Sequence, residues 1–102
     1  MAKPRIVWFD QAVRDLESIS DYLATDRGLP IALAFTERIQ QSVALLQTFP
    51  EIGPPRIFGR HEGRILVPRR FSHYLIFYRY DTTIGDVQIV RILKARDLSF
   101  LR

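Results

Sequence analysis

The sequence predicts a single α+β domain of two layers, in which a helical hairpin covers one face of a small antiparallel sheet. Three observations predict this fold. Apolar residues recur at three- and four-residue steps in the first half of the chain, and the spacing changes to a period of two in the second half. A chain of 102 residues is long enough for one hydrophobic core. The 47% hydrophobic and 25% charged residues are typical of a globular protein. The expected order is β-α-α-β-β-β over residues 1–102.

The first half of the chain is expected to hold one strand and two helices. Residues 5–8 are β-branched and aromatic, which predicts a strand. Asp10 stands where a helix N-cap belongs, and Gly28 suits the end of that helix. Pro30 suits the first turn of a second helix, which should end before Pro50. The apolar stripes of the two helices are Ala12, Val13, Leu16, Ile19, Tyr22 and Leu23, and then Ile31, Phe35, Ile39, Val43 and Leu46. The short break between them predicts an antiparallel hairpin.

The second half is expected to form an antiparallel meander. Residues 50–63 are rich in proline and glycine and are predicted to be an irregular connection. Residues 64–67, 74–80 and 87–93 have the composition of strands and are separated by short turns. One face of this meander must take the helical hairpin.

Composition excludes several classes of protein. The chain has no cysteine, hence no disulfide or Cys-based metal site. It has no apolar run of membrane-spanning length and no signal-peptide core near its start. His61, Glu62 and His73 lack a third ligand at a suitable spacing, and no glycine-rich phosphate loop is present. We therefore expect a cytoplasmic protein without a metal or other cofactor.

Positive charge is concentrated in the second half. Residues 1–55 carry five basic and seven acidic side chains, whereas residues 56–102 carry ten basic and four acidic ones. Such an imbalance favours binding of a polyanion or an acidic protein, although a solvated basic surface is the alternative. The candidate target-binding residues are Lys94, Arg96, Arg102, Arg69 and Arg70.

Three further observations bear on whether these basic residues form one binding site. Arg91 and Lys94 should point to opposite faces unless the strand ends or bulges near Leu93. Arg96 has an alternative role as the structural ion-pair partner of Asp97 or of a helix carboxylate such as Asp15. A row formed by Tyr74, Tyr78 and Tyr80 has two interpretations, as a base-stacking surface or as the half-buried rim of the sheet.

Three segments together resemble the RelE/ParE superfamily of toxins from bacterial type II toxin–antitoxin systems. Residues 12–22 resemble the family pattern A-x-x-D-L-x-x-I-x-x-Y. Residues 34–53 resemble its long helix that ends in L-x-x-x-P-x-x-G. Residues 74–78 and 90–97 resemble its Y-x-I-x-Y and R-I-L-H-x-x-R-D signatures. The order and spacing of these segments extend the resemblance over essentially the whole chain.

The resemblance implies a partner protein. Such toxins form hetero-oligomers with a cognate antitoxin, here expected to be ParD-like, whose ribbon-helix-helix part binds operator DNA. Contact with operator DNA would then occur only through the antitoxin, and the residues that bind the antitoxin stay unassigned. An acidic antitoxin segment would suit the basic second half of this chain.

The resemblance also implies one of two activities. RelE-like members cleave mRNA on the ribosome, and only Arg96 matches one of their basic catalytic positions. Residues 64–67 lack their paired lysines, Lys94 replaces a frequent histidine, and residues 98–102 contain no tyrosine. These departures favour the ParE branch, which inhibits DNA gyrase by binding and has no assigned catalytic site. The alternatives are a RelE-like ribonuclease that uses Arg96 and a non-toxic adaptor that binds only the antitoxin.

Overall fold

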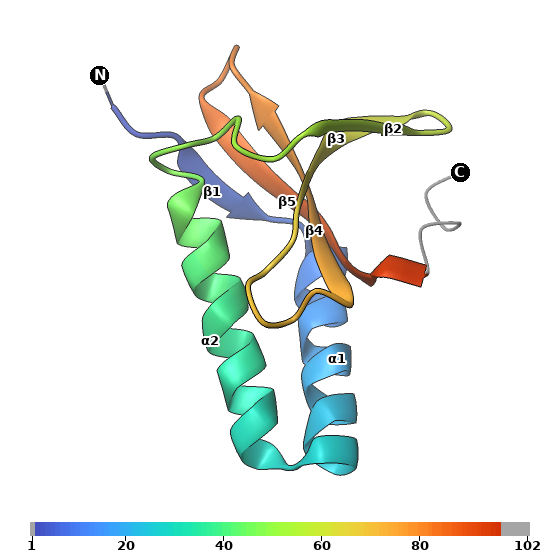
Figure 1. Cartoon of the computed structure of the whole chain (residues 1–102). Helices are drawn as coiled ribbons and strands as arrows, with labels where there is room; N and C mark the ends of the chain where they lie inside the picture. Colours follow the sequence, from blue (N-terminus) through green and yellow to red (C-terminus); the bar gives the residue numbers. More distant parts are fainter. Residues whose placement is uncertain (1, 97–102) are drawn as a thin grey trace.

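The computed structural model describes residues 2–96, with Phe58 described by its backbone alone. Two helices lie side by side against a five-stranded sheet (Figure 1). The elements in chain order are β1 (Arg5–Trp8), α1 (Asp10–Arg27), α2 (Leu29–Leu45), β2 (Pro55–Phe58), β3 (His61–Leu66), β4 (Tyr74–Asp81) and β5 (Asp86–Lys94). The predicted two-layer α+β fold with one helical hairpin is confirmed.

The sheet is mixed, with the strand order β1-β5-β4-β3-β2. Strands β3, β4 and β5 form the predicted antiparallel meander. Strand β1 joins it in parallel, because Arg5 pairs with Asp86 and Trp8 with Ile89. The sheet is therefore not wholly antiparallel. After β1, the two helices carry the chain to the opposite edge of the sheet, and β2, β3, β4 and β5 then follow in order back toward β1.

Strand β2 is an addition to the expected elements, because residues 55–58 were predicted to be irregular. It pairs only with β3, so it is an edge strand, where a first-residue proline such as Pro55 loses no ladder hydrogen bond. Phe58 pairs with His61 across a two-residue turn in which Gly59 has a φ of 60°. Pro55 thus begins the hairpin formed by β2 and β3, and Gly59 lies in its turn.

The helical hairpin depends on one glycine. Gly28 ends α1 and begins α2 with a φ of 99°, a conformation that favours glycine. Its amide donates to the carbonyl of Ala24. The expected N-cap at Asp10 is wrong by one residue, because Phe9 is the N-cap and no side chain caps the helix. Asp10 instead lies in the first turn, where a carboxylate still interacts favourably with the helix dipole.

The core between the layers contains most of the predicted apolar stripes. The buried helix residues are Ala12, Ile19, Leu23, Ala32, Phe35, Ile39 and Val43, followed after α2 by Leu46. From the sheet come Tyr74, Ile76, Tyr78, Val87, Ile89 and Ile92. Three residues of the expected stripes, Val13, Tyr22 and Ile31, are 38%, 50% and 39% exposed. They lie at the margins of the buried faces.

A second apolar cluster lies on the opposite face of the sheet. It consists of Ile65, Leu75, Phe77 and Leu93, with Val90 packed against it; we call it the outer cluster. Val90 is also the extra residue of a bulge, because Phe77 pairs with Arg91 and Tyr78 pairs with Ile89. The bulge precedes both Arg91 and Lys94, so these two residues keep the opposite directions that the sequence predicts.

Candidate functional site

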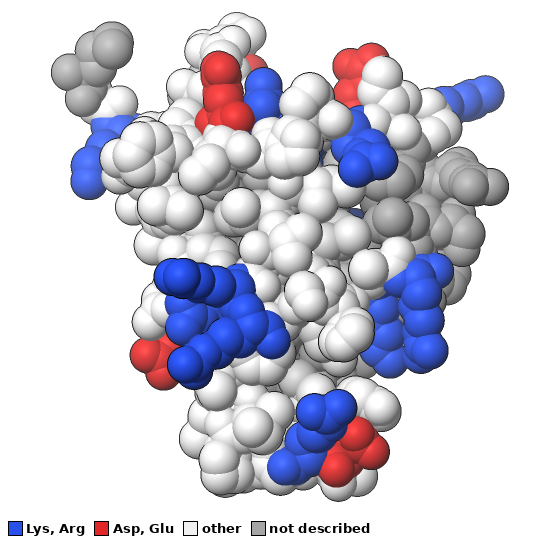
Figure 2. Space-filling view, in the orientation of Figure 1, with Lys and Arg blue, Asp and Glu red and all other residues white. Residues whose placement is uncertain are grey.

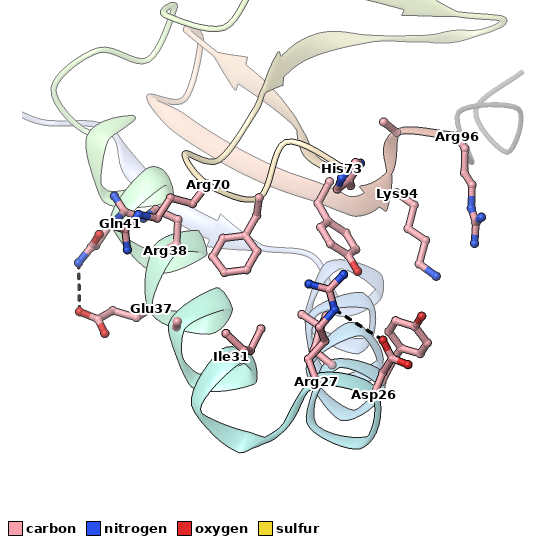
Figure 3. A pocket seen from close by; sticks show the side chains of 16 residues that line it. Asp26, Arg27, Ile31, Glu37, Arg38, Gln41, Arg70, His73, Lys94 and Arg96 are labelled. Carbon is pink, nitrogen blue, oxygen red and sulfur yellow. Dashed lines mark hydrogen bonds and ion pairs between the residues drawn. The ribbon is translucent and has the colours of Figure 1, made fainter.

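A groove of about 830 Å³ opens where the hairpin meets the end of the sheet. Its walls come from the C-terminal part of α1, residues 31–41 of α2, the loop before β4 and the end of β5 (Figure 3). The lining residues are Tyr22, Leu23, Asp26, Arg27, Ile31, Ala34, Glu37, Arg38, Gln41, Arg70, Phe71, His73, Tyr74, Lys94, Ala95 and Arg96. The groove thus brings together the helical hairpin, the loop before β4 and the end of β5, which are distant in sequence.

The groove carries an excess of positive charge. Five of its lining residues are cationic, namely Arg27, Arg38, Arg70, Lys94 and Arg96, and two are anionic, namely Asp26 and Glu37. On the surface, Lys and Arg gather in separate groups around an area of uncharged side chains (Figure 2). Arg70 and Arg38 lie on one side of the groove, and Lys94 and Arg96 lie on the other (Figure 3). The arrangement suits a ligand with an apolar body and anionic groups at its edges.

Aromatic side chains build the floor and one wall. The buried ring of Phe35 contacts Phe71 and Tyr74, with ring centroids 5.2 and 5.0 Å apart. These edge and tilted contacts hold the two lining rings against the core. The Lys94 ammonium lies 4.6 Å from the centroid of the half-exposed Tyr22 ring. Burial raises the pKa of the Tyr74 hydroxyl, so this group is neutral at physiological pH.

Comparison with known proteins identifies the family. Residues 6–98 match the family model described as the ParE toxin of the type II toxin–antitoxin system parDE. The chain belongs to the ParE toxin family. A solved structure titled "Chromosomal ParDE TA system from P. aeruginosa" is similar, with 25% identity and a TM-score of 0.75. The similarity covers 90% of this chain and 96% of the other. No curated protein matches the sequence.

Three of the five predicted binding residues line the groove of this ParE-family chain. They are Lys94 and Arg96 at the end of β5 and Arg70 in the loop before β4. Arg70 has a φ of 73°, a left-handed conformation that a non-glycine residue rarely adopts. Arg69 is exposed but does not line the groove, and Arg102 lies outside the described residues. Clustered charge in the sequence therefore grouped three residues that line the groove with Arg69, which lies outside it.

The sequence analysis missed the contribution of the helices. Arg27 and Arg38 belong to the half of the chain with net negative charge, which drew attention away from them. A usable signal was nevertheless present on α2. Ile31, Ala34, Arg38 and Gln41 are separated by three or four residues, the spacing that places them on one helix face. This face borders the buried stripe and forms a wall of the groove.

Several other basic residues have structural roles instead. Arg91 and Asp15 form an ion pair, which corrects the alternative expectation of a pair between Arg96 and Asp15. The Arg64 guanidinium donates to the carbonyls of Glu51 and Gly53. These contacts hold the cations against the sheet and the loop after α2, so they are not available to a ligand in the groove.

The tyrosine row on β4 does not form a base-stacking surface. Tyr78 is fully buried, and its hydroxyl accepts a hydrogen bond of 2.9 Å from the Gly53 amide. Tyr74 is also buried and packs on Phe35. Only Tyr80 stays partly exposed. The row is a core face with one residue at its rim.

The described part of the chain contains neither a metal-binding cluster nor a membrane-spanning helix. Within residues 2–96, no three His, Cys, Asp or Glu side chains gather closely enough to hold a metal ion. In the same range, no helix combines the length and apolar character that crossing a membrane requires.

Proposed function

We propose that this ParE-family chain is the toxin of a ParD–ParE-type pair, that it inhibits DNA gyrase by binding, and that a cognate antitoxin neutralises it. The observation that carries the proposal is the family match over residues 6–98. The similarity to the chromosomal ParDE structure over nearly the whole chain supports it. Because the similar structure is of a ParDE system, we expect a ParD-like antitoxin here.

The groove is the proposed contact surface for the target. Lys94, Arg96 and Arg70 line it together with exposed apolar side chains such as Ile31. A mixed apolar and cationic surface is suited to a protein partner that offers carboxylates around an apolar contact. Arg69, a further predicted contact, would act outside the groove, and Arg102 lies outside the described residues. The proposed toxin acts by association and needs no cofactor.

The side-chain contacts favour binding over RNA cleavage. A ribonuclease needs a proton-transfer group beside residues that stabilise the developing phosphorane charge. Lys94 occupies the position of the frequent RelE-like histidine, but its ammonium lies over the Tyr22 ring, a contact that uses its positive charge. On β5 the Arg91 guanidinium pairs with Asp15, and on β4 the Arg79 guanidinium donates to the Glu62 carbonyl. These arrangements use the cations for structure and charge recognition.

Induction of the protein alone in bacteria, followed by pulse-labelling of DNA and protein synthesis, tests the proposal. We expect DNA synthesis to fall first and co-expression of the antitoxin to restore it. Inhibition of supercoiling by purified gyrase, relieved by the purified antitoxin, would give the matching result in vitro. An early fall in protein synthesis would instead support a RelE-like ribonuclease with Arg96 as its phosphate-stabilising residue. Unchanged growth, with antitoxin binding retained, would indicate an adaptor.

A further inference from the structure

Arg70 occupies a backbone position that ordinarily belongs to glycine. The amide of Phe71 donates to the carbonyl of Pro68, so residues 68–71 form a β-turn in which Arg70 is the third residue. Its φ of 73° is that of a type II turn, where glycine or asparagine is usual at this place. Another residue there strains the backbone, and strain of this kind is concentrated at functional sites. The arginine side chain therefore has a role that glycine could not fill.

Both sides of this turn are packed into the protein, which fixes where Arg70 lies. Pro68 is fully buried. The Phe71 ring packs edge-on against Phe35 of α2, with centroids 5.2 Å apart. Phe35 precedes Arg38 by three residues, so the two lie on neighbouring positions of one helix face. The contact between the rings therefore brings Arg70 and Arg38 to the same side of the groove (Figure 3).

The two arginines have no counterion in the described chain. Within residues 2–96, neither guanidinium forms a hydrogen bond or an ion pair. The adjacent carboxylate on α2, that of Glu37, accepts a hydrogen bond from the Gln41 side-chain amide instead (Figure 3). Two cations thus lie on one side of the groove with donors that no described residue uses.

We propose that Arg38 and Arg70 form a carboxylate-binding subsite of the groove, which receives one aspartate or glutamate side chain of the protein target. The subsite rests on the proposed function, because it supplies the charged group by which the target would be recognised. Each guanidinium presents a planar fork of donors that matches the two oxygens of a carboxylate. The exposed Ile31 lines the same wall of α2 and offers an apolar contact beside the subsite.

A protein carboxylate suits this surface better than a nucleic-acid backbone does. Asp26 and Glu37 also line the groove. A backbone with a phosphate at every nucleotide would place further negative charges near them, and like charges brought together in an interface are unfavourable. A single carboxylate on an apolar segment can reach the two arginines and leave both acidic side chains in water.

Thermal unfolding tests whether Arg70 is kept at the expense of stability. Arg70→Gly relieves the strain at a φ of 73°, which glycine adopts readily. Arg69→Gly, at the preceding turn position, adds the same freedom to the unfolded chain but has no positive φ to relieve. We expect Arg70→Gly to unfold at a temperature several degrees higher than Arg69→Gly. An equal or lower temperature would show that the Arg70 side chain stabilises the fold, which would overturn the proposal.

Inhibition of supercoiling by purified gyrase tests the role in binding. Arg70→Gly and Arg38→Gln should each weaken inhibition by about tenfold, because each removes a charged contact to the partner. Together they should weaken it by less than the product of the separate effects, since both arginines hold one carboxylate. Arg60→Ala, an exposed arginine between β2 and β3, should inhibit like the wild-type protein.

The same assay separates failure of the subsite from failure of the proposed function. Full inhibition by the Arg38 and Arg70 variants would overturn the subsite and leave the proposed function intact. Absence of inhibition by the wild-type protein would refute the proposed function itself. Loss of antitoxin binding alone would assign the two arginines to the antitoxin and contradict the proposal.

An NMR titration tests the subsite without gyrase. Citrate, added at millimolar concentration as a carboxylate probe, should shift the Nε–H signals of Arg38 and Arg70 together. In Arg70→Gly, the Arg38 signal should respond only at higher citrate concentration. Inorganic phosphate is the second probe, and a response to phosphate alone would indicate a site for a nucleic-acid backbone. That result, or no response to either anion, would overturn the proposal.

Discussion

The carboxylate of Asp15 and the guanidinium of Arg91 form a bidentate ion pair, with Nε–Oδ2 at 2.7 Å and Nη2–Oδ1 at 3.1 Å. Oδ2 also accepts the backbone N–H of Ile92 at 3.0 Å. Strand β1 pairs with β5 only as far as Ile89. Beyond that point, the carboxylate from α1 takes the place of a neighbouring strand. A single side chain thus joins the helical layer to the open edge of the sheet.

Replacement of Asp15 by alanine should destabilise the protein. The change leaves the partly buried Arg91 guanidinium without its carboxylate and the Ile92 amide without its acceptor. Hydrogen bonds to charged groups of this kind contribute about 1.5–3 kcal/mol. Chemical denaturation would measure the loss in the free energy of unfolding. Asp21→Ala, at an exposed position of the same helix, is the control, and an equal loss in both variants would refute the role of Asp15.

Replacement of Tyr78 by phenylalanine should cost about 1–3 kcal/mol, because the buried Gly53 amide loses its acceptor. The ring volume is nearly unchanged, so no large cavity contributes to the loss. Tyr80→Phe, at a partly exposed position of the same strand, should have a much smaller effect. Thermal unfolding of the two variants side by side checks the difference. Similar stability of the two variants would argue against this hydrogen bond.

Stability should fall at alkaline pH. Burial raises the pKa of Tyr78 above its ordinary value of about 10, so the folded state retains this proton more strongly than the unfolded chain does. The contribution of Tyr78 is therefore fully present below about pH 10 and is lost as the pH rises through the folded-state pKa. Unfolding temperatures measured from pH 8 to 11 should decline at the upper end. The decline should be smaller in Tyr78→Phe, and an identical decline would contradict this assignment.

Gly63→Ala should be more destabilising than Gly85→Ala. At Gly63 the added methyl would lie 2.6 Å from the Tyr78 carbonyl oxygen and 2.7 Å from the Phe77 ring. At Gly85 nothing lies within 4 Å, and the cost arises only from its φ of 72°, about 1–2 kcal/mol. Denaturant midpoints of the two variants give the comparison. A larger loss in Gly85→Ala would show that the sheet adjusts readily near Phe77.

The combination Lys94→Ala and Arg96→Ala should abolish the proposed toxicity while the protein stays folded. Both side chains line the groove, and removal of two contacts to a partner typically weakens binding by about tenfold or more. Growth after induction measures toxicity, and circular dichroism measures folding. Arg60→Ala, an exposed arginine between β2 and β3, should leave growth arrest unchanged. Persistent arrest in the double variant would place the target contact elsewhere.

Periodicity was enough to predict the two helices, the meander and most of the core. It was not enough to predict that β1 lies beside β5, because the pairing of two distant strands leaves no local pattern. Strand β2 was missed because Pro55 is compatible with an edge strand as well as with an irregular segment. Charge clustering located the β5 side of the groove. It could not locate Arg27 and Arg38, which depend on how the hairpin packs against the sheet.

The parallel pairing of β1 with β5 has a consequence for synthesis of the protein on the ribosome. Arg5 is bonded to Asp86, a residue 81 positions later in the chain. At about 5–20 residues per second, β1 is made roughly 4–16 s before its partner strand. A nascent chain that stalls before β5 has neither a complete sheet nor the Lys94 wall of the groove. Any activity of the groove can therefore begin only after β5 has been made.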